Sequence, residues 1–404
     1  MPAHEPPGRT TSLDAGSRAR ILTRVRAALD RTADYVANTA NYEHSEDLWP
    51  ADSEIFTTNP MSLAYGACGP ALFLNCTSAP AGLPDQAVKW ILDSPIGTDS
   101  YPPGVCLGLA GIAVTLMDLR MPERALEAMG LAYRSPLAFE ETNFFYGCAG
   151  WGTASLHLHQ ATGERAMLDG ALRAGEHLLK AAHREGETCH WGPNAQGSIP
   201  YGFGYGASGC ALFLLHLHSV TGDTQFRDAA VRALSYDLEH GTVGPLGWQW
   251  QDYEGGALIK PYWMSGAAGV GSTLLRFHRA LGDDRFLIDA RRIARDTSVK
   301  FTVEPGLFQG LAGIAEFFLD MYVHTGEGIF RDHALDIADT IMWFGIRRQE
   351  GTAWPGRRLR KISNDYATGA AGIGLFFDRL LQPRARFLLD LPLHYSPPTH
   401  RRAG

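Results

Sequence analysis

The chain has little positive charge, few cysteines and no long apolar run, and each shortage excludes a class of protein. Lys and Arg number 36 against 43 Asp and Glu, for a net charge of −7, which disfavours nucleic acid as a partner. Apolar runs such as residues 211–215 are far shorter than the ~20 residues of a membrane helix. The polar, Pro-rich start lacks a signal-peptide core, and six cysteines scattered over 404 residues favour reduced thiols. We therefore expect a cytoplasmic protein that binds neither nucleic acid nor membranes.

Glycine, by contrast, is abundant and recurs in a pattern. The chain has 45 glycines, and seven G-x-x-G phrases each open an apolar segment, with a mean period of about 50 residues. Such self-similarity indicates a repeat architecture rather than two or three separate domains. The phrases begin at Gly66, Gly108, Gly147, Gly206, Gly266, Gly310 and Gly369.

Each repeat carries a second mark that predicts a helical hairpin. Sixteen residues after the first glycine stands another glycine in most copies (Gly82, Gly163, Gly222, Gly282 and Gly326). This spacing suits a helix of about four turns that ends at a glycine cap. In the last four of these copies an acidic residue follows, which suits the start of the next helix. We therefore predict an all-α fold of seven hairpins.

The two helices of each predicted hairpin differ in polarity. The first is almost wholly apolar, as in residues 211–217 and 314–321, whereas the second is amphipathic, as in residues 165–183. This difference predicts two layers, with the first helices inside the second; an α/α barrel or an α-solenoid would satisfy it. The long, Trp-rich loops 183–205, 237–262 and 346–368 each lead back to a glycine phrase. Loops and phrases therefore share one end of the fold, where function tends to gather.

The glycine phrases admit two interpretations. Seven helix starts around one end would form an electropositive bowl for an anion, an enolate or a peptide carbonyl. Alternatively, the glycines only let crowded inner helices approach each other, which is the interpretation we favour for any single copy.

The predicted domain boundaries follow from the same pattern. We expect a disordered segment over residues 1–16, a single domain over 17–382 and a tail over 383–404. Ser17 is predicted to cap a helix over residues 18–39 that packs on the first repeat. The tail is predicted to form a last short helix and a frayed end.

Several phrases resemble the LanC-like lanthionine cyclases. They are Gly-Leu-Ala-Gly-Ile at 108–112 and 310–314, Tyr-Trp-Met-Ser-Gly-Ala-Ala-Gly at 262–269, and Ala-Thr-Gly-Ala-Ala-Gly-Ile-Gly at 367–374. The resemblance covers residues 57–380. It implies a double-layered α/α toroid of seven hairpins, in agreement with the repeat count. It also implies addition of a peptide cysteine thiol to dehydroalanine or dehydrobutyrine, which closes a thioether ring.

The zinc ligands that the resemblance implies are missing. Members of the family hold zinc with two cysteines and a histidine, and those positions are Met264, Phe308 and Gln309 here. None supplies a thiolate or imidazole ligand. The chain is in this respect similar to the cyclase domains of class III lanthipeptide synthetases. Elsewhere, the pairs His157/His159 and His216/His218 are spaced i, i+2 and do not share a helix face, and the adjacent pair 189–190 lies in a loop, so we expect no metal cofactor.

The resemblance also nominates residues for chemistry. Lys260 stands where the family has an arginine, Tyr205 where it has a histidine and Asn143 where it has an aspartate. We predict that the Lys260 ammonium stabilises a thiolate or enolate and that Tyr205 delivers the proton. The predicted substrate-binding residues are Asn143, Gln309, Tyr146, Met264, Asp365 and Tyr366.

Three functions remain open from the sequence. The first is a zinc-independent cyclase for a dehydrated precursor peptide, with separate kinase and lyase proteins, whose products are thioether rings or labionin-type carbon–carbon crosslinks. The second is a catalytically silent scaffold that binds the peptide or a partner enzyme. The third is an α/α-barrel glycan enzyme, which the tryptophans permit, although no convincing pair of catalytic carboxylates stands at the glycine-phrase end.

Overall fold

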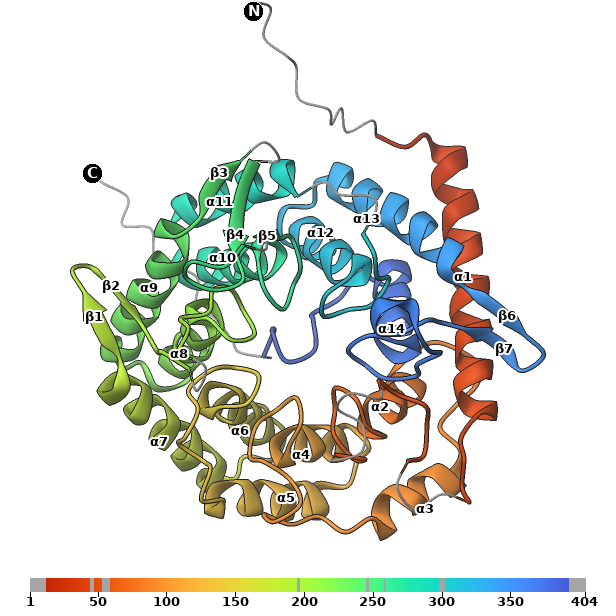
Figure 1. The fold of residues 1–404 in the computed structure, drawn as a ribbon, viewed down its shortest axis with the longest axis horizontal. Coiled ribbons are helices and arrows are strands. Elements are labelled where there is room, and N and C mark those ends of the chain that lie inside the picture. Colours follow the sequence, from red (N-terminus) through yellow and green to blue (C-terminus); the bar gives the residue numbers. More distant parts are fainter. Residues whose placement is uncertain are drawn as a thin grey trace, which may run out of the picture.

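The protein is a ring of helices in two layers (Figure 1). The computed structural model describes residues 12–43, 47–52, 59–194, 197–244, 247–257, 259–297 and 302–391. The inner helices are α2 (Cys68–Cys76), α4 (Leu109–Asp118), α6 (Cys148–Thr162), α8 (Ala207–Thr221), α10 (Ala267–Leu281), α12 (Leu311–Thr325) and α14 (Ala370–Leu381). The outer helices are α1 (Ala15–Asn38), α3 (Asp85–Asp93), α5 (Pro122–Arg134), α7 (Arg165–Ala181), α9 (Thr224–Glu239), α11 (Asp284–Asp296) and α13 (Gly328–Ile341). The predicted double-layered toroid of seven helix pairs is confirmed.

The helix boundaries follow the repeat signals. Gly163, Gly222, Gly282 and Gly326 end four inner helices with φ between 68° and 74°, the left-handed conformation that glycine adopts most easily. The acidic residue after each glycine is the N-cap of the next outer helix. The first copy departs from this pattern, because α2 ends at Cys76 and Gly82 caps no helix.

The seventh pair joins opposite ends of the sequence. The outer partner of α14 is α1, which packs mainly against α14, α13 and the loop hairpin between them. The prediction that the N-terminal helix packs on the first repeat is confirmed only in part: α1 contacts α2, but it packs mainly on the last repeat and so closes the ring. The capping residue also differs from the prediction. The N-cap is Asp14, whose carboxylate accepts the N–H of Ser17 at 2.8 Å, and the helix begins at Ala15. Residues 1–11 of the predicted disordered segment lie outside the described residues.

A closed circle of backbone hydrogen bonds surrounds the axis of the toroid; we call it the hydrogen-bond ring. Each member stands two positions before the first glycine of its phrase, donates its N–H to the next member and accepts from the previous one. The bonds run from Ala64 to Cys106 (2.9 Å), to Phe145 (3.3 Å), to Gly204 (2.9 Å), to Met264 (2.7 Å), to Phe308 (3.0 Å), to Ala367 (2.9 Å) and back to Ala64 (3.0 Å). The ring fixes the register of all seven repeats.

The glycine phrases act in packing, as the second of the two interpretations proposed. A Cβ on the second glycine of each phrase would lie between 1.9 Å (Gly111) and 2.7 Å (Gly69) from the carbonyl oxygen six residues earlier. The first N–H of four inner helices is likewise occupied by a carbonyl of the preceding loop. These bonds run from Leu109 to Pro102 (2.9 Å), Cys148 to Glu141 (2.9 Å), Leu311 to Glu304 (3.0 Å) and Ala370 to Ser363 (2.9 Å). The alternative interpretation, a bowl of open helix N-termini, does not hold for these four helices, because their first donors are already used.

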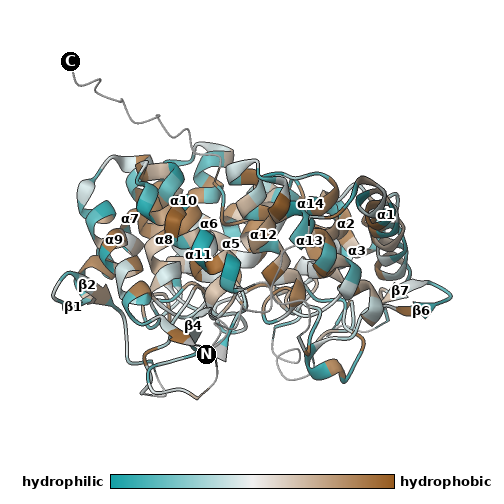
Figure 2. Cartoon of the chain, turned by 90° about the horizontal axis from the view of Figure 1, so that it is seen from above, coloured by the Kyte–Doolittle hydropathy of each residue, from teal (hydrophilic) through white to brown (hydrophobic). Residues whose placement is uncertain are grey.

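The three long loops contain short strands. They form two antiparallel hairpins and one three-stranded sheet: β1 (His183–Glu185) with β2 (Thr188–His190), β3 (Thr242–Gly244) with β4 (Gly247–Gln251) and β5 (Ile259–Lys260), and β6 (Ile346–Arg348) with β7 (Gly351–Ala353). Two short 3-10 helices, η2 (Met342–Phe344) and η3 (Arg357–Leu359), complete the described elements. Figure 2 shows the strands and loops together at one end of the toroid, as predicted. We call this end the loop face and the opposite end the tail face. None of the described helices is long and apolar enough to cross a lipid bilayer.

The segment after α14 is not the predicted short helix. Residues 383–391 turn inward and cross the centre of the ring (Figure 1), where Leu388, Leu389 and Leu391 are buried. Buried ion pairs hold the segment to α10 and α12, among them Arg276 with Asp390 at 2.7 Å. The remainder of the predicted tail, residues 392–404, lies outside the described residues.

His216 gives the fold a measurable acid sensitivity. It is fully buried in α8, and both ring nitrogens lack a hydrogen-bond partner among the described residues. Burial lowers its pKa from 6.5 to about 3, so the unfolded chain takes up this proton at a higher pH than the folded protein. His216 therefore costs stability as pH falls from about 6.5 towards 3. Between pH 7 and pH 4, this histidine should lower the free energy of unfolding of the wild-type protein by about 2–3 kcal/mol, and His216→Leu should remove that decrease.

Urea unfolding followed by circular dichroism at several pH values would measure this effect. His218→Leu is the matched control, because His218 lies in the same helix, is half-buried and bonds the carbonyl of Asp223 at 2.9 Å. Equal pH dependence in the two variants would contradict the prediction.

Candidate functional site

An open cavity of about 840 Å³ lies on the loop face; we call it the loop-face cavity. The loops before α6, α8, α10 and α12 each contribute to its wall. Five predicted site residues line it together: Asn143, Tyr146, Tyr205, Lys260 and Gln309. Three of them, Tyr146, Tyr205 and Gln309, stand directly between a member of the hydrogen-bond ring and the first glycine of a phrase. The repeat itself therefore places them around the axis.

Lys260 is held in place by backbone and charge. It lies on β5 opposite Trp250 of β4, and its Nζ is 3.3 Å from the Asp252 carboxylate. A Cβ on Gly266 would lie only 1.7 Å from the Lys260 carbonyl oxygen, and Gly266 has a φ of 117°, so this close approach requires glycine. The Lys260 side chain retains 21% of its exposure and presents its cation to the cavity.

Two tyrosine hydroxyls form a hydrogen-bonded pair in the cavity. Burial, reinforced by the neighbouring Tyr146, raises the pKa of Tyr205 well above 10, and the two hydroxyls are hydrogen-bonded to each other. Tyr146 is 38% exposed and connects the pair to solvent, while the ring of Phe145 stacks at 5.0 Å from Tyr205. Tyr205 therefore remains protonated at neutral pH and is suited to give up a proton rather than to accept one.

The side-chain amides of Asn143 and Gln309 differ in whether they are already hydrogen-bonded within the protein. Asn143 accepts the N–H of Tyr146 at 2.8 Å and donates to Glu141 at 3.0 Å, so it holds the loop before α6. Burial raises the pKa of Glu141. The half-buried Gln309 side chain has no hydrogen-bond partner among the residues that the structure describes. Its amide is thus available to a bound peptide group.

Two positions of the family's metal site are apolar and closed. Met264 and Phe308 belong to the hydrogen-bond ring, are only 1% and 3% exposed, and do not line the cavity. The Met264 sulfur fills the space beside Gly204, where a Cβ would lie 2.0 Å from it. Phe308 packs against the rings of Trp263 and Tyr366 at 5.4 and 5.7 Å. These residues do not fit a zinc ion, and the described part of the chain contains no group of three or more His, Cys, Asp or Glu placed to hold a metal.

Asp365 and Tyr366 do not reach the loop-face cavity. Asp365 is 1% exposed and holds the turn before α14 by accepting from the N–H groups of Thr368 at 2.6 Å and Gly369 at 3.2 Å. It also accepts the N–H of Asp52 at 3.1 Å. Tyr366 lines a different cavity. Together with Met264, these residues are thus placed away from the cavity they were predicted to share.

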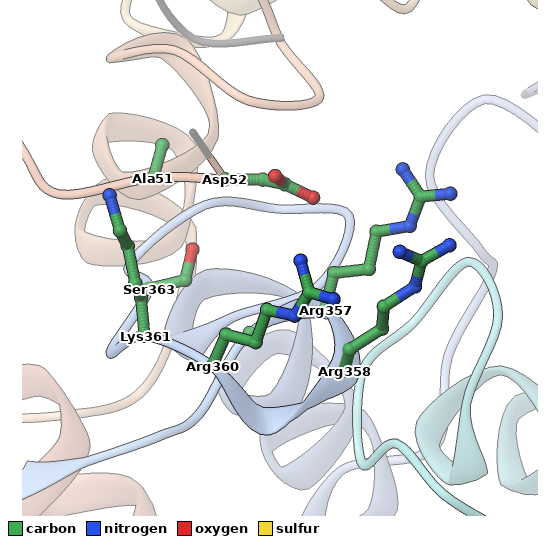
Figure 3. Close-up of a pocket in the computed structure, with 8 residues that line it drawn as sticks. Ala51, Asp52, Arg357, Arg358, Arg360, Lys361 and Ser363 are labelled. Carbon is green, nitrogen blue, oxygen red and sulfur yellow. The ribbon is translucent and has the colours of Figure 1, made fainter. Parts of the chain in front are cut away.

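Sequence reasoning missed three features of the loop face. Ser265 and Asp252 line the cavity. Ser265 was recognisable from the sequence, because it directly precedes a glycine phrase. The pairing of Asp252 with Lys260 was not, because it depends on the fold of the sheet. A separate basic pocket is formed by Arg357, Arg358, Arg360 and Lys361, with Asp52 on its rim (Figure 3). Its signal, four cations in five residues, is visible in the sequence.

Comparison with known proteins defines first the fold and then the family. Nisin cyclase superposes with a TM-score of 0.64 at 13% identity, over 80% of this chain and 89% of that one. A family 76 glycoside hydrolase (mannosidase) from Bacteroides thetaiotaomicron superposes with a TM-score of 0.52 at 11% identity, over 89% and 97%. At such identities these similarities establish the α/α toroid alone.

The family follows from the sequence comparisons. The model of lanthionine synthetase C-like proteins matches residues 126–391, and the chain belongs to this family. A Streptomyces coelicolor protein named "Probable SapB synthase" is 29% identical over 383 residues, which is 93% of this chain. The chain spans only 39% of the length of that relative.

Proposed function

We propose that this protein is a lanthipeptide cyclase that works without zinc. It would bind a dehydrated precursor peptide in the loop-face cavity and promote addition of a cysteine thiol to dehydroalanine or dehydrobutyrine. Dehydration would come from kinase and lyase activities on separate proteins. The observation that carries the proposal is the convergence of Lys260, Tyr205 and Gln309, from three different loops, on one cavity in a lanthionine synthetase C-like fold.

The proposed reaction adds S–H across a carbon–carbon double bond. The thiol loses its proton to solvent base, and its sulfur bonds to the β-carbon of the dehydroamino acid. The π electrons move to the α-carbon as an enolate, whose charge the Lys260 ammonium and the Gln309 amide stabilise. Tyr205 then transfers its proton to the α-carbon and is reprotonated from solvent through Tyr146. Capture of the enolate by a second dehydroalanine would instead give a labionin-type carbon–carbon crosslink.

A direct test uses a synthetic peptide with one cysteine and one dehydroalanine. Incubation with the full chain, with and without a strong chelator, should accelerate ring closure equally and yield a single stereoisomer. A rate equal to that of peptide alone, or a rate abolished by the chelator and restored by zinc, would contradict the proposal. A second dehydroalanine in the peptide would reveal crosslinking by mass spectrometry.

Tyr205→Phe should separate proton delivery from binding. The variant keeps the aromatic ring against Phe145 but loses the donor, so we expect ring closure to slow by about 10-fold or more with mixed stereochemistry at the α-carbon. The raised pKa of Tyr205 predicts that the wild-type rate continues to rise with thiol ionisation to at least pH ~9. Chiral analysis of the product measures both.

The control is Tyr253→Phe, which removes a hydroxyl from the same cavity at an exposed position. A Tyr205→Phe enzyme with the rate and stereochemistry of this control would remove Tyr205 from the mechanism.

The scaffold alternative predicts binding without acceleration. Asn143 is already hydrogen-bonded to Glu141 and Tyr146, and Lys260 is already paired with Asp252, which is compatible with such a role. Against the glycan alternative, seven of the nine tryptophans are buried. Trp191 and Trp250, for example, donate their indole N–H groups to the carbonyls of Leu178 in α7 and Asp237 in α9, so they cap outer helices.

A further inference from the structure

A buried carboxyl group of the outer helix α9 holds the turn that carries Tyr205. This turn, residues 201–208, runs from the loop into the start of α8, against which α9 packs (Figure 1); we call it the Tyr205 turn. Oδ2 of Asp237 accepts the N–H of Gly202 at 3.2 Å and the N–H of Ser208 at 2.8 Å. The same oxygen accepts the Ser208 hydroxyl. Asp237 therefore ties both ends of the turn to the outer layer of helices.

Backbone hydrogen bonds hold the Tyr205 turn to the neighbouring loop as well. The N–H of Gly204, directly before Tyr205, belongs to the hydrogen-bond ring and bonds the next member at 2.7 Å. The N–H of Tyr201 bonds the carbonyl of Asp252 at 3.2 Å. In this set of contacts, only the bonds to Asp237 use an acceptor on a side chain. They are therefore the part of the arrangement that a single substitution can remove.

Ser208 departs from the pattern of the repeat. Its position, the third of the G-x-x-G phrase, holds alanine in five of the other six phrases and cysteine in the first. The inner helices thus pack closely without a hydroxyl group at this position. The one phrase that has a hydroxyl there is the phrase that follows Tyr205, and this hydroxyl is buried against Asp237.

Keeping the carboxyl group of Asp237 inside the protein is costly. The residue is fully buried, and its Oδ1 atom has no hydrogen-bond partner among the described residues. Burial raises the pKa of Asp237 to about 7, although the hydrogen bonds from Ser208 and Gly202 oppose part of that rise. A buried polar group that is only partly satisfied lowers stability. The pair of Asp237 and Ser208 is therefore explained better by what it holds than by packing.

We propose that Asp237 is a positioning residue that holds Tyr205 in the orientation for proton transfer to the α-carbon. The inference rests on the proposed cyclase activity and adds to it a residue that does not line the loop-face cavity. Catalysis depends steeply on geometry, and a displacement of about 1 Å can slow a reaction by ~10²-fold. Without Asp237, the Tyr205 turn loses three hydrogen bonds, and the Tyr205 hydroxyl is no longer held beside the enolate.

A double-mutant cycle tests whether Asp237 acts through Tyr205. Asp237→Ala should slow ring closure by about 10–100-fold at saturating peptide, with mixed stereochemistry at the α-carbon and little change in KM. Tyr205→Phe already lacks the proton donor, so adding Asp237→Ala to it should slow the reaction by less than about 3-fold more. Asp237→Asn keeps an oxygen for the three donors and should retain the wild-type stereochemistry. Losses that multiply in the double variant, or a single stereoisomer from Asp237→Ala, would overturn the proposal.

Amide hydrogen exchange of the full chain measures the turn without any reaction. In Asp237→Ala, the N–H groups of Gly202 and Ser208 should exchange about 10-fold faster or more, because they lose their acceptor. If Asp237→Ala does not fold, Ser208→Ala removes only the hydroxyl and should change exchange and stereochemistry less, in the same direction. Unchanged exchange at Gly202 in both variants would mean that Asp237 does not hold the turn.

The matched control is Asp365→Ala. Asp365 is also buried and holds a turn before an inner helix, through the N–H of Thr368 at 2.6 Å, but that turn carries no residue of the cavity. This variant should leave exchange in residues 201–208 and the product stereochemistry as in wild type. Faster exchange in Asp237→Ala with wild-type stereochemistry would remove Asp237 from the mechanism and leave the cyclase proposal standing. Absence of acceleration by the wild-type protein would instead remove the cyclase proposal itself.

Discussion

Lys260→Met is expected to slow ring closure by about 10–100-fold while leaving peptide binding nearly intact. The Lys260 ammonium faces the cavity beside Tyr205, and the proposed transition state develops negative charge there. Removing one preorganised charge of this kind typically costs ~10²-fold or more. The expected loss is somewhat smaller here, because Asp252 at 3.3 Å already offsets part of the positive charge and the side chain is partly exposed. Initial rates of thioether formation under single-turnover conditions measure the effect.

A double variant separates electrostatics from misfolding. Lys260→Met leaves the Asp252 carboxylate unpaired, whereas Lys260→Met with Asp252→Asn restores local neutrality. If the ammonium acts on the reaction, both variants should be slow and the double variant should regain any lost stability. Lys361→Met, in the basic pocket of Figure 3, is the control for loss of a lysine on the same face. An unchanged rate in Lys260→Met would leave the scaffold as the better account of this protein.

The repeat made most of the fold predictable. Seven glycine phrases gave the number of inner helices, and the glycines followed by an acidic residue gave four helix ends that the structure confirms. The role of α1 was not predictable, because its apolar stripe shows that it is buried but not against which helix. The inward path of residues 383–391 was missed for a related reason. Leu388, Leu389 and Leu391 are too few to give a period, and their burial depends on ion pairs with α10 and α12.

The register of the repeat also explains which site residues were found. Tyr146, Tyr205 and Gln309 each stand directly before the first glycine of a phrase, so the repeat brings all three to the cavity. Asp365 was misplaced because an acidic residue beside a phrase was taken as a ligand. Its carboxylate instead accepts from the N–H and the hydroxyl of Thr368, and so holds the turn that precedes α14. Contacts such as Lys260 with Asp252 were beyond sequence reasoning, because they depend on how β4 and β5 pair.

Asp320→Asn is expected to destabilise the protein by about 3–5 kcal/mol, the range for breaking a buried charge pair. Asp320 is 3% exposed, and its carboxylate lies 2.6 Å from Arg276, 2.7 Å from Arg379 and 3.3 Å from Arg386. Asparagine would leave three buried guanidinium groups with one carboxylate fewer. Chemical unfolding followed by tryptophan fluorescence at pH 7 measures the loss. Asp339→Asn is the control, because Asp339 pairs with Arg24 at an exposed position where ion pairs contribute little.

The pH dependence of this loss gives a second test. Burial alone would raise the pKa of Asp320, but Arg276, Arg379 and Arg386 outweigh burial and hold it well below 3.8. The folded pKa is thus below the unfolded value, so Asp320 contributes its stability above pH ~4, and this contribution is lost as pH falls further. The difference between wild type and Asp320→Asn should therefore be constant from pH 5 to 8 and shrink below pH ~4. A constant difference throughout, or a loss no larger than that of Asp339→Asn, would mean that the three arginines find other partners and that residues 383–391 are held in the ring by their leucines alone.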